Sequence, residues 1–359
     1  MSLRDDLKKA EAANDPLAIP LANHEKVKQA NTRLKAELGR EQRRREEVQA
    51  ELDILLNMTN TVSEAPKWMT PKKKSTDHKG IVSLVVSDCH FDEVVEPGEV
   101  DWLNAYNRDI AVKRLKRTFE RTVILSRDYL SGITYEGCSL FLGGDMVTGT
   151  IHEELAQSNE AFMPETILYW IDQLSAGIDM LNDEFGKVHV AGVVGNHGRN
   201  TKKPRAKGRV RDNWDWLIYK LLARDFKDVD DITFQIPESA DCIVEQYDNK
   251  ILFTHGDQFR GGSGISGILA PLMRGDHRKR KRHMETDRPY DYMLMGHFHQ
   301  YMNAKKVIVN GSNKGYDEYA YMGNFDFEEP QQAFWIATPE HGPILHAPIF
   351  TQNRKDEGW

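Results

Sequence analysis

Residues 81–90 read IVSLVVSDCH, an aliphatic run that leads directly into side chains able to bind a metal ion. A continuous β-branched and aliphatic run of this length is typical of a strand that is buried on both faces. Asp88 and His90 follow the run at once. The pattern therefore predicts a buried strand whose carboxyl end presents polar ligands.

The same arrangement occurs four more times between residues 139 and 299. Each time a short apolar run ends in a segment rich in glycine, aspartate, asparagine or histidine. The runs and the segments that follow them are 139–142 with Gly144-Asp145, 188–194 with Gly195-Asn196-His197, 251–253 with His255, and 292–295 with Gly296-His297-Phe298-His299. Ligands bind beyond the carboxyl ends of strands in open α/β sheets, so we expect the five ends to meet at one site.

The residue types in these segments suit a pair of divalent cations. Carboxylate and imidazole together favour Mn²⁺, Fe or Zn²⁺, whereas an all-oxygen set would indicate Mg²⁺ or Ca²⁺. Two such ions, roughly 3.5–4 Å apart, clamp a phosphate ester and supply hydroxide at neutral pH. Buried Asp, Asn and His side chains at apolar strand ends gain nothing without a compensating cation. We predict two divalent ions, Mn²⁺ ahead of Fe or Zn²⁺.

In their order and spacing the five segments resemble the motif series of the calcineurin-like metallophosphoesterase superfamily, over about residues 80–312. The resemblance implies an α/β fold, a four-layer α/β/β/α sandwich of two mixed sheets. The metal ligands that it implies are Asp88, His90 and His299 for one ion, Asn196, His255 and His297 for the other, and Asp145 for both.

The resemblance also implies a catalytic histidine that is not a metal ligand. His197 would protonate the departing oxygen or stabilise the charged transition state. Many members of the superfamily have an acidic residue directly after this histidine, but Gly198 stands here. Another group must therefore orient His197. His152, Glu153 or Glu154 is a candidate, although this segment is equally typical of a solvated helix start.

Two basic stretches, 202–211 and 277–283, lie between the motifs in a chain whose net charge is −7. We interpret both as basic loops beside the metal crevice, as binding to a nucleic-acid backbone requires. The glycine-rich loop 256–264 is flexible enough to fold over a phosphate, and a guanidinium group offers phosphate a bidentate fork. The candidate substrate-binding residues are Arg199, His152 and Arg260.

The glycine-rich loop and residues 310–320 resemble phage-encoded phosphoesterases that are grouped with DNA-repair exonucleases. This resemblance implies a virus-encoded phosphodiesterase or nuclease acting on DNA. Two alternatives remain open: a phosphomonoesterase similar to protein serine/threonine phosphatases, and a non-catalytic assembly protein that acts through an N-terminal helix.

Composition sets the wider limits. The 359 residues, 40% of them hydrophobic, are enough for one catalytic domain, placed at residues 80–359, and an accessory segment. No apolar run approaches the roughly 20 residues that span a bilayer, so we expect no membrane association. Three cysteines without metal-type spacing indicate a reducing cytoplasm, the host's if the protein is virus-encoded.

Residues 1–60 are predicted to form a separate helical segment, followed by a linker over residues 61–79. The heptad positions are Val27, Asn31, Leu34, Leu38, Glu41, Arg45, Val48, Leu52 and Leu55, six of them apolar. Such a seam predicts a coiled coil with a second copy of the chain or with a partner protein. The alternative is a single solvated helix lying on the catalytic domain.

Helical periodicity over residues 108–130, 166–185 and 211–226 alternates with the predicted strands, as in an α/β core. Residues 333–337 and 344–350 are predicted to add strands that close the domain.

Overall fold

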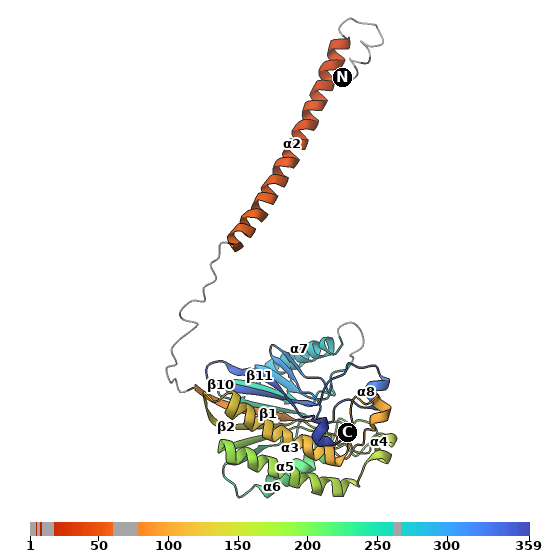
Figure 1. The fold of residues 1–359 in the computed structure, drawn as a ribbon, viewed down its shortest axis with the longest axis vertical. Coiled ribbons are helices and arrows are strands. Elements are labelled where there is room, and N and C mark those ends of the chain that lie inside the picture. Colours follow the sequence, from red (N-terminus) through yellow and green to blue (C-terminus); the bar gives the residue numbers. More distant parts are fainter. Residues whose placement is uncertain (1–4, 6–7, 9–17, 60–77, 261–266) are drawn as a thin grey trace. The chain divides into compact units, whose positions relative to one another are not determined.

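The computed structural model describes residues 5, 8, 18–59, 78–260 and 267–359, and Figure 1 shows its fold. The chain divides into two units, Met1–Ser75 and Thr76–Trp359. Within the described residues, no helix is both long and apolar enough to cross a membrane. Most of the predicted linker lies outside the described residues, and its last two residues belong to the first strand, which begins at His78.

The first unit contains one long helix, α2 (Ala18–Thr59), of 42 residues. Five apolar residues of the heptad seam lie on it and are 47–61% exposed, namely Val27, Leu34, Leu38, Val48 and Leu52. The predicted long N-terminal helix is confirmed, and its pairing in a coiled coil stays a prediction.

The second unit is built on two mixed sheets. The first sheet has the order β11-β10-β1-β2-β3-β4, in which β1 to β4 are parallel to one another and β10 is antiparallel to both of its neighbours, β1 and β11. Its strands are β1 (His78–Val86), β2 (Ile133–Leu142), β3 (Val188–Gly192), β4 (Ile232–Gln235), β10 (Gln331–Thr338) and β11 (Gly342–Phe350).

The second sheet has the order β5-β6-β7-β9-β8, with β6, β7 and β9 parallel to one another. Its strands are β5 (Asp241–Gln246), β6 (Asn249–Thr254), β7 (Tyr292–Met295), β8 (Met302–Ala304) and β9 (Val307–Val309). The edge strands β5 and β8 pair antiparallel with β6 and β9.

Helices cover the outer faces of the two sheets. The helices α3 (Arg108–Ile124), α5 (Met163–Phe185) and α6 (Trp214–Asp225) lie on the first sheet, and α7 (Leu269–Glu285) lies on the second (Figure 1). The shorter elements are η2 (Pro97–Val100), η3 (Leu125–Tyr129), α4 (Glu153–Ser158), α8 (Glu318–Met322) and α9 (Arg354–Glu357).

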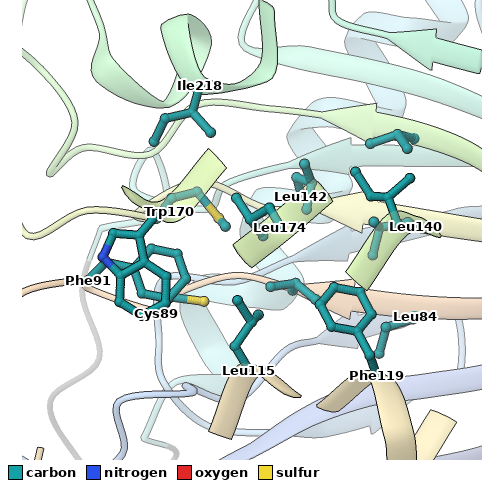
Figure 2. Close-up of a cluster of buried hydrophobic side chains, with 14 of the residues drawn as sticks. Leu84, Cys89, Phe91, Leu115, Phe119, Leu140, Leu142, Trp170, Leu174 and Ile218 are labelled. Atoms are coloured by element: carbon teal, nitrogen blue, oxygen red, sulfur yellow. The ribbon is translucent and has the colours of Figure 1, made fainter. Parts of the chain in front are cut away.

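Three apolar clusters fill the spaces between these layers. The first joins α3, α5 and α6 to the first sheet, and Figure 2 shows part of it, with Leu115, Leu140 and Leu174. The second lies between the sheets and contains Phe141, Phe253 and Trp335. The third joins the second sheet to α7 through Leu252, Leu272 and Met293. Three cores separate four layers, so the predicted α/β/β/α sandwich is confirmed.

The central strand β1 shows how the sequence produces these layers. Successive side chains of a strand point to opposite faces. Val82, Leu84 and Val86 accordingly pack in the first cluster, while Val85 packs between the sheets. A strand with apolar residues on both faces is stable only when both faces are covered, as the sequence predicts.

The basic stretch 277–283 is not a loop. It lies in α7, so its interpretation as a loop is wrong. The residues that α7 buries include Leu272, Asp276, Lys279 and His283, which share one helical face. Three of these four are polar or charged, and apolar periodicity therefore did not reveal the helix.

Three predicted elements are shorter than expected, one of them the helix predicted over residues 211–226, which is α6 (Trp214–Asp225). The helix predicted over residues 108–130 ends as an α-helix at Ile124 and continues as the π-helical turn η3, and the strand predicted over 188–194 ends at Gly192. The hydroxyls of Thr118 and Thr122 in α3 and of Ser126 in η3 each donate to the carbonyl four residues earlier, which loosens a helix.

Candidate metal centre

The loops after β1, β2 and β3 meet because these strands are parallel neighbours in the first sheet, and β6 and β7 are likewise parallel neighbours in the second. Backbone hydrogen bonds then join one loop to the next. Asp88 N donates to Gly144 O at 3.1 Å and His90 N donates to Asp145 O at 3.0 Å. The ligand-bearing segments after β1 and β2 are therefore held in register by the backbone itself.

Two buried apolar residues orient the first segment. Cys89 and Phe91 point into the core of the first sheet, where Phe91 stacks on Trp170 with ring centroids 3.6 Å apart (Figure 2). Their insertion leaves the alternate residues, Asp88 and His90, for the side of the loop that carries the site. Both are buried as well, with exposures of 0% and 2%.

One cluster of potential ligands contains Asp88, His90 and His299, whose donor atoms all lie within 4.8 Å of one another. The Nε2 atoms of His90 and His299 are 3.2 Å apart. His299 Nε2 also lies 3.4 Å from Asp88 Oδ1. These three residues come from the loops after β1 and β7.

A second cluster contains Asp145, His255 and His297, again with donor atoms within 4.8 Å. His255 Nε2 lies 3.0 Å from Asp145 Oδ2 and 3.2 Å from Asn196 Oδ1. A third group, made of His90, Asp145 and His197, overlaps both clusters. Asp145 therefore lies between the two sets of ligands.

The spacing of these atoms fits a shared cation. Two ligand atoms that each lie about 2.0–2.2 Å from one ion are separated from each other by about 2.9–3.5 Å. The four separations above run from 3.0 to 3.4 Å. Lone pairs of imidazole, carboxylate and amide that converge at such distances repel one another, and a cation between them removes the conflict. The residues present therefore fit a metal site.

Hydrogen bonds fix which nitrogen of His255 faces the cluster. Its Nδ1 lies 2.8 Å from the Gly143 carbonyl, which can only accept, so Nδ1 carries the hydrogen. With an ion bound, Nε2 would present its lone pair from the side that faces Asp145 and Asn196. Ligating histidines in proteins are commonly oriented by such a second hydrogen bond.

The residue that orients His197 is also identified. His197 Nδ1 donates to the Thr148 carbonyl at 3.0 Å, so a backbone group takes the place of the acidic residue that Gly198 replaces. The ring lies 4.5 Å from that of His90 and 5.8 Å from that of His152, centroid to centroid. Burial lowers the pKa of His197, with Asp145 acting in the opposite direction.

A buried ion-pair network supports Thr148. Lys314 donates to Glu93 at 2.8 Å and also to Asp317, and the Thr148 hydroxyl donates to the other oxygen of Glu93 at 2.9 Å. All four side chains are buried. The carbonyl that orients His197 is therefore held by a buried network in which one cation, Lys314, pairs with two carboxylates.

Backbone strain is present at the same positions. Five of the candidate ligands have left-handed φ angles: Asp88 at 51°, His90 at 45°, Asp145 at 48°, His297 at 71° and His299 at 55°. Each such residue costs on the order of 1–3 kcal/mol and persists only when its surroundings enforce it. Strain of this kind gathers at functional sites, which supports a functional role for this cluster.

Two glycines are required by the carboxylates next to them. A Cβ at Gly195 would stand 2.1 Å from Asp145 Oδ1, and a Cβ at Gly296 would stand 2.2 Å from Asp88 Oδ2. No side chain fits at either position without moving a candidate ligand.

The charged groups of the buried site shift one another's pKa values. Burial opposes a charge on His255, yet Asp145 raises the pKa of His255 to about 10. Burial and the neighbouring His255 lower the pKa of His297 to about 4. Without an ion, a proton on His255 thus supplies the positive charge next to Asp145.

The sequence analysis missed Asp215. Its buried carboxylate accepts hydrogen bonds from Asp145 N at 3.0 Å, Met146 N at 3.1 Å and Gly195 N at 2.9 Å. It joins the loops after β2 and β3, and burial followed by the charge of Asp145 raises its pKa to about 7. An aspartate in the first turn of a helix usually indicates only a favourable dipole interaction, so the sequence carried no specific signal.

The three candidate substrate-binding residues differ in their surroundings. Arg199 donates to the carbonyls of Asn196, Thr201 and Lys202, at 2.7, 2.8 and 3.0 Å. His152 is exposed near His197. Arg260 is exposed too, and residues 261–266 of its glycine-rich loop lie outside the described residues. Their role in substrate binding stays a prediction.

Comparison with known proteins gives structural likenesses only. No protein-family model and no curated protein matches the chain. A predicted phosphoesterase from Streptococcus pneumoniae is 13% identical, covers 75% of this chain and 98% of its own, and has a TM-score of 0.29. Vps29 from Entamoeba histolytica, in complex with Zn²⁺, is 13% identical over 76% of this chain and 100% of its own, with a TM-score of 0.26.

A candidate 5′-nucleotidase from Staphylococcus aureus is 12% identical, covers 78% of this chain and 57% of its own, and has a TM-score of 0.35. Likenesses at this level decide nothing about substrate or catalysis. What the chain can do follows from its own site, which is a buried cluster of histidine and carboxylate ligands at strand ends.

Proposed function

We propose that this chain is a phosphodiesterase that depends on two divalent metal ions and acts on nucleic acid. One observation carries the proposal: two clusters, Asp88-His90-His299 and Asp145-His255-His297, are connected by a third group that contains Asp145. A mixed imidazole and carboxylate set of this kind favours Mn²⁺, Fe or Zn²⁺.

Each part of the site has a defined task in this proposal. Asp88, His90 and His299 would hold one ion, Asn196, His255 and His297 would hold the other, and Asp145 would serve both. When bound, the two ions would neutralise charge on the phosphate and make water a nucleophile near neutral pH. His197 is oriented by the Thr148 carbonyl through Nδ1, which leaves Nε2 free. When Nε2 is protonated, it can pass its proton to the departing oxygen.

Charge near the site supports nucleic acid as the substrate. The basic segment 202–211 begins six residues after Asn196, and its lysines are exposed. Local positive charge in a chain whose net charge is −7 favours binding to a phosphate backbone. The resemblance to phage-encoded exonuclease-type phosphoesterases makes DNA the first substrate to test.

The test is an assay of the full chain with Mn²⁺ and four substrates: bis-p-nitrophenyl phosphate, p-nitrophenyl phosphate, single-stranded DNA and double-stranded DNA. Asp145→Asn is expected to lower kcat on the diester by about a hundredfold or more, because loss of a metal ligand exceeds the 10–100-fold typical of second-shell changes. Asp179→Asn, an exposed change on α5, is the matched control. Turnover of the monoester alone would replace this proposal with a phosphomonoesterase.

Metal binding is measured separately, by titrating Mn²⁺ into the chelated protein in a calorimeter. Wild-type protein is expected to bind two ions and Asp145→Asn to bind them more weakly. If both proteins bind no ion, the proposed metal centre is wrong whatever the assay shows.

For α2 we propose association with a second copy of the chain. The exposed apolar seam is the observation that favours this role, since exposed leucines at heptad spacing are stabilised by pairing. In sedimentation velocity, Leu34→Glu combined with Leu38→Glu is expected to convert dimer to monomer. Arg40→Glu combined with Arg43→Glu, outside the seam, should leave the dimer intact. A monomeric wild-type chain contradicts the proposal.

A further inference from the structure

A pocket opens beside the candidate metal centre, and basic side chains line it. Four of them surround the space: Arg199, Arg205, Lys207 and Arg209. Asn196 lines the same pocket. Its side-chain oxygen faces His255 in the metal cluster, at 3.2 Å, so the pocket and the cluster share a wall.

The loop that forms the pocket is closed at its base. Arg199 and Asn213 form an antiparallel bridge, and Trp214 N donates to Gly198 O at 2.7 Å. The three carbonyl contacts of Arg199 brace the loop from inside. Its side chains are therefore presented from a defined backbone, which lowers the entropic cost of binding a ligand.

The far side of the loop is hydrogen-bonded to the segment after β6, which carries His255. Arg209 forms two hydrogen bonds with the carboxylate of Asp257, at 2.8 and 2.7 Å. Its third donor, Nε, is buried and has no hydrogen-bond partner. A buried guanidinium N–H without an acceptor is costly, and an anion in the pocket would satisfy it.

Three of the four cations have no acidic partner among the described residues, and one of them, Arg199, donates to three backbone carbonyls. Among the residues that the structure describes, Arg205 and Lys207 form no ion pair. One acidic residue, Asp212, also lines the pocket, and its carboxylate accepts from Asn200 Nδ2 at 2.9 Å. The balance of charge inside the pocket is positive, so its ligand is an anion.

From this geometry we propose that the pocket binds a second, non-reacting phosphate of the substrate, next to the phosphate held at the metal centre. This inference rests on the proposed phosphodiesterase function and deepens it. Arg205, Lys207 and the free N–H of Arg209 contact the second phosphate. Substrates with consecutive phosphates, such as an oligonucleotide, are then favoured over a diester that contains one phosphate.

The experiment measures binding before activity. A fluorescent single-stranded 10-mer oligodeoxynucleotide is titrated into the full chain with a chelator present, so that no metal contributes, and anisotropy gives Kd. Arg205→Ala combined with Lys207→Ala is expected to raise Kd about tenfold, since each charged hydrogen bond to phosphate contributes measurably to affinity. Both residues are exposed and unpaired, so thermal unfolding should not change.

The matched control is Lys202→Ala combined with Lys203→Ala. It removes the same charge from the same loop, but neither side chain lines the pocket. Its Kd is expected to stay within about twofold of wild type. If the two double variants weaken binding equally, the loop acts only as a diffuse positive surface and the subsite is wrong. An unchanged Kd in the pocket variant overturns it too.

Kinetics with Mn²⁺ then separate this inference from the function on which it rests. The pocket variant should raise KM for the oligonucleotide and leave bis-p-nitrophenyl phosphate, which has one phosphate, unaffected. If the variant loses activity on both substrates, Arg205 and Lys207 are needed for folding or for catalysis in general, and the subsite is wrong. A wild-type chain that hydrolyses no diester would refute the proposed function, while the metal-free binding result would still decide the pocket.

Discussion

The two basic stretches, 202–211 and 277–283, are similar in composition and different in structure. The first is a loop whose Arg205 and Lys207 are exposed and line a pocket beside the metal centre. The second lies in α7, where Lys279 is buried and forms an ion pair with Asp241 at 2.5 Å. The loop leaves cations available to a ligand, whereas α7 uses Lys279 inside the fold and pairs Arg280 and Arg282 with acidic side chains.

The acidic partners explain the difference. In α7, Arg282 also pairs with Asp241, and Arg280 pairs with Asp276 at 2.8 Å. In the loop, the partner of Arg209 is Asp257, next to the site. A basic run therefore predicts an anion-binding surface only where the tertiary structure supplies no acidic side chain to neutralise it.

The largest effect is expected from removing the acidic partner in β5. Asp241→Ala leaves buried Lys279 without its counterion, and breaking such a pair costs about 3 kcal/mol or more. Urea unfolding should show this loss in the free energy of unfolding, while Asp248→Asn, exposed on the turn after β5, should show almost none. Equal stability of the two variants would mean that α7 does not depend on the pair.

The same pair predicts a dependence on pH. Burial works against the charge of Asp241, but Lys279 and Arg282 hold its pKa below the usual value. A lowered pKa in the folded state contributes stability above about pH 4, and this contribution is lost as the pH falls through the folded pKa. The stability difference between wild type and Asp241→Asn should therefore be constant near neutrality and shrink in acid. A difference that grows in acid contradicts the assigned direction.

The next largest effect is expected on the salt dependence of DNA binding. Each contact with a phosphate of a single strand contributes a slope of about 0.7 in log K against log salt. Arg205 and Lys207 contact one phosphate in the proposed subsite, so replacing both with alanine should flatten the slope by roughly 0.7. Wild type and variant are compared by anisotropy from 50 to 200 mM salt, the range over which such contacts lose affinity. Parallel lines would show that neither side chain meets a phosphate.

The smallest effect is expected on α7. Arg278→Ala combined with Lys281→Ala removes two exposed charges from α7, one of them 3.9 Å from Glu285. Stability should change by about 0.5 kcal/mol or less, and oligonucleotide binding by less than about twofold. If these changes weaken binding as much as changes in the loop do, both stretches bind nucleic acid and the contrast between them disappears.

Much of the fold could be predicted from the sequence, because buried elements leave a local pattern of apolar residues. Apolar residues follow the strand pattern in β1, β10 and β11. They follow the helical period in the helices that cover the first sheet. The helix α7 was not readable, because its buried face includes Asp276, Lys279 and His283. Such residues are stable there only through partners distant in sequence.

The candidate site divides in the same way. Ligand type and position at strand ends are local, so the sequence by itself predicted the segments that supply candidate ligands, and the superfamily resemblance implied which seven side chains would hold two ions. Only the tertiary structure decided that Asp215 joins two ligand loops, that the Thr148 carbonyl orients His197 and that the first basic stretch forms a pocket. Those contacts join segments up to 70 residues apart, and no local pattern encodes which distant groups a folded chain brings within hydrogen-bond distance.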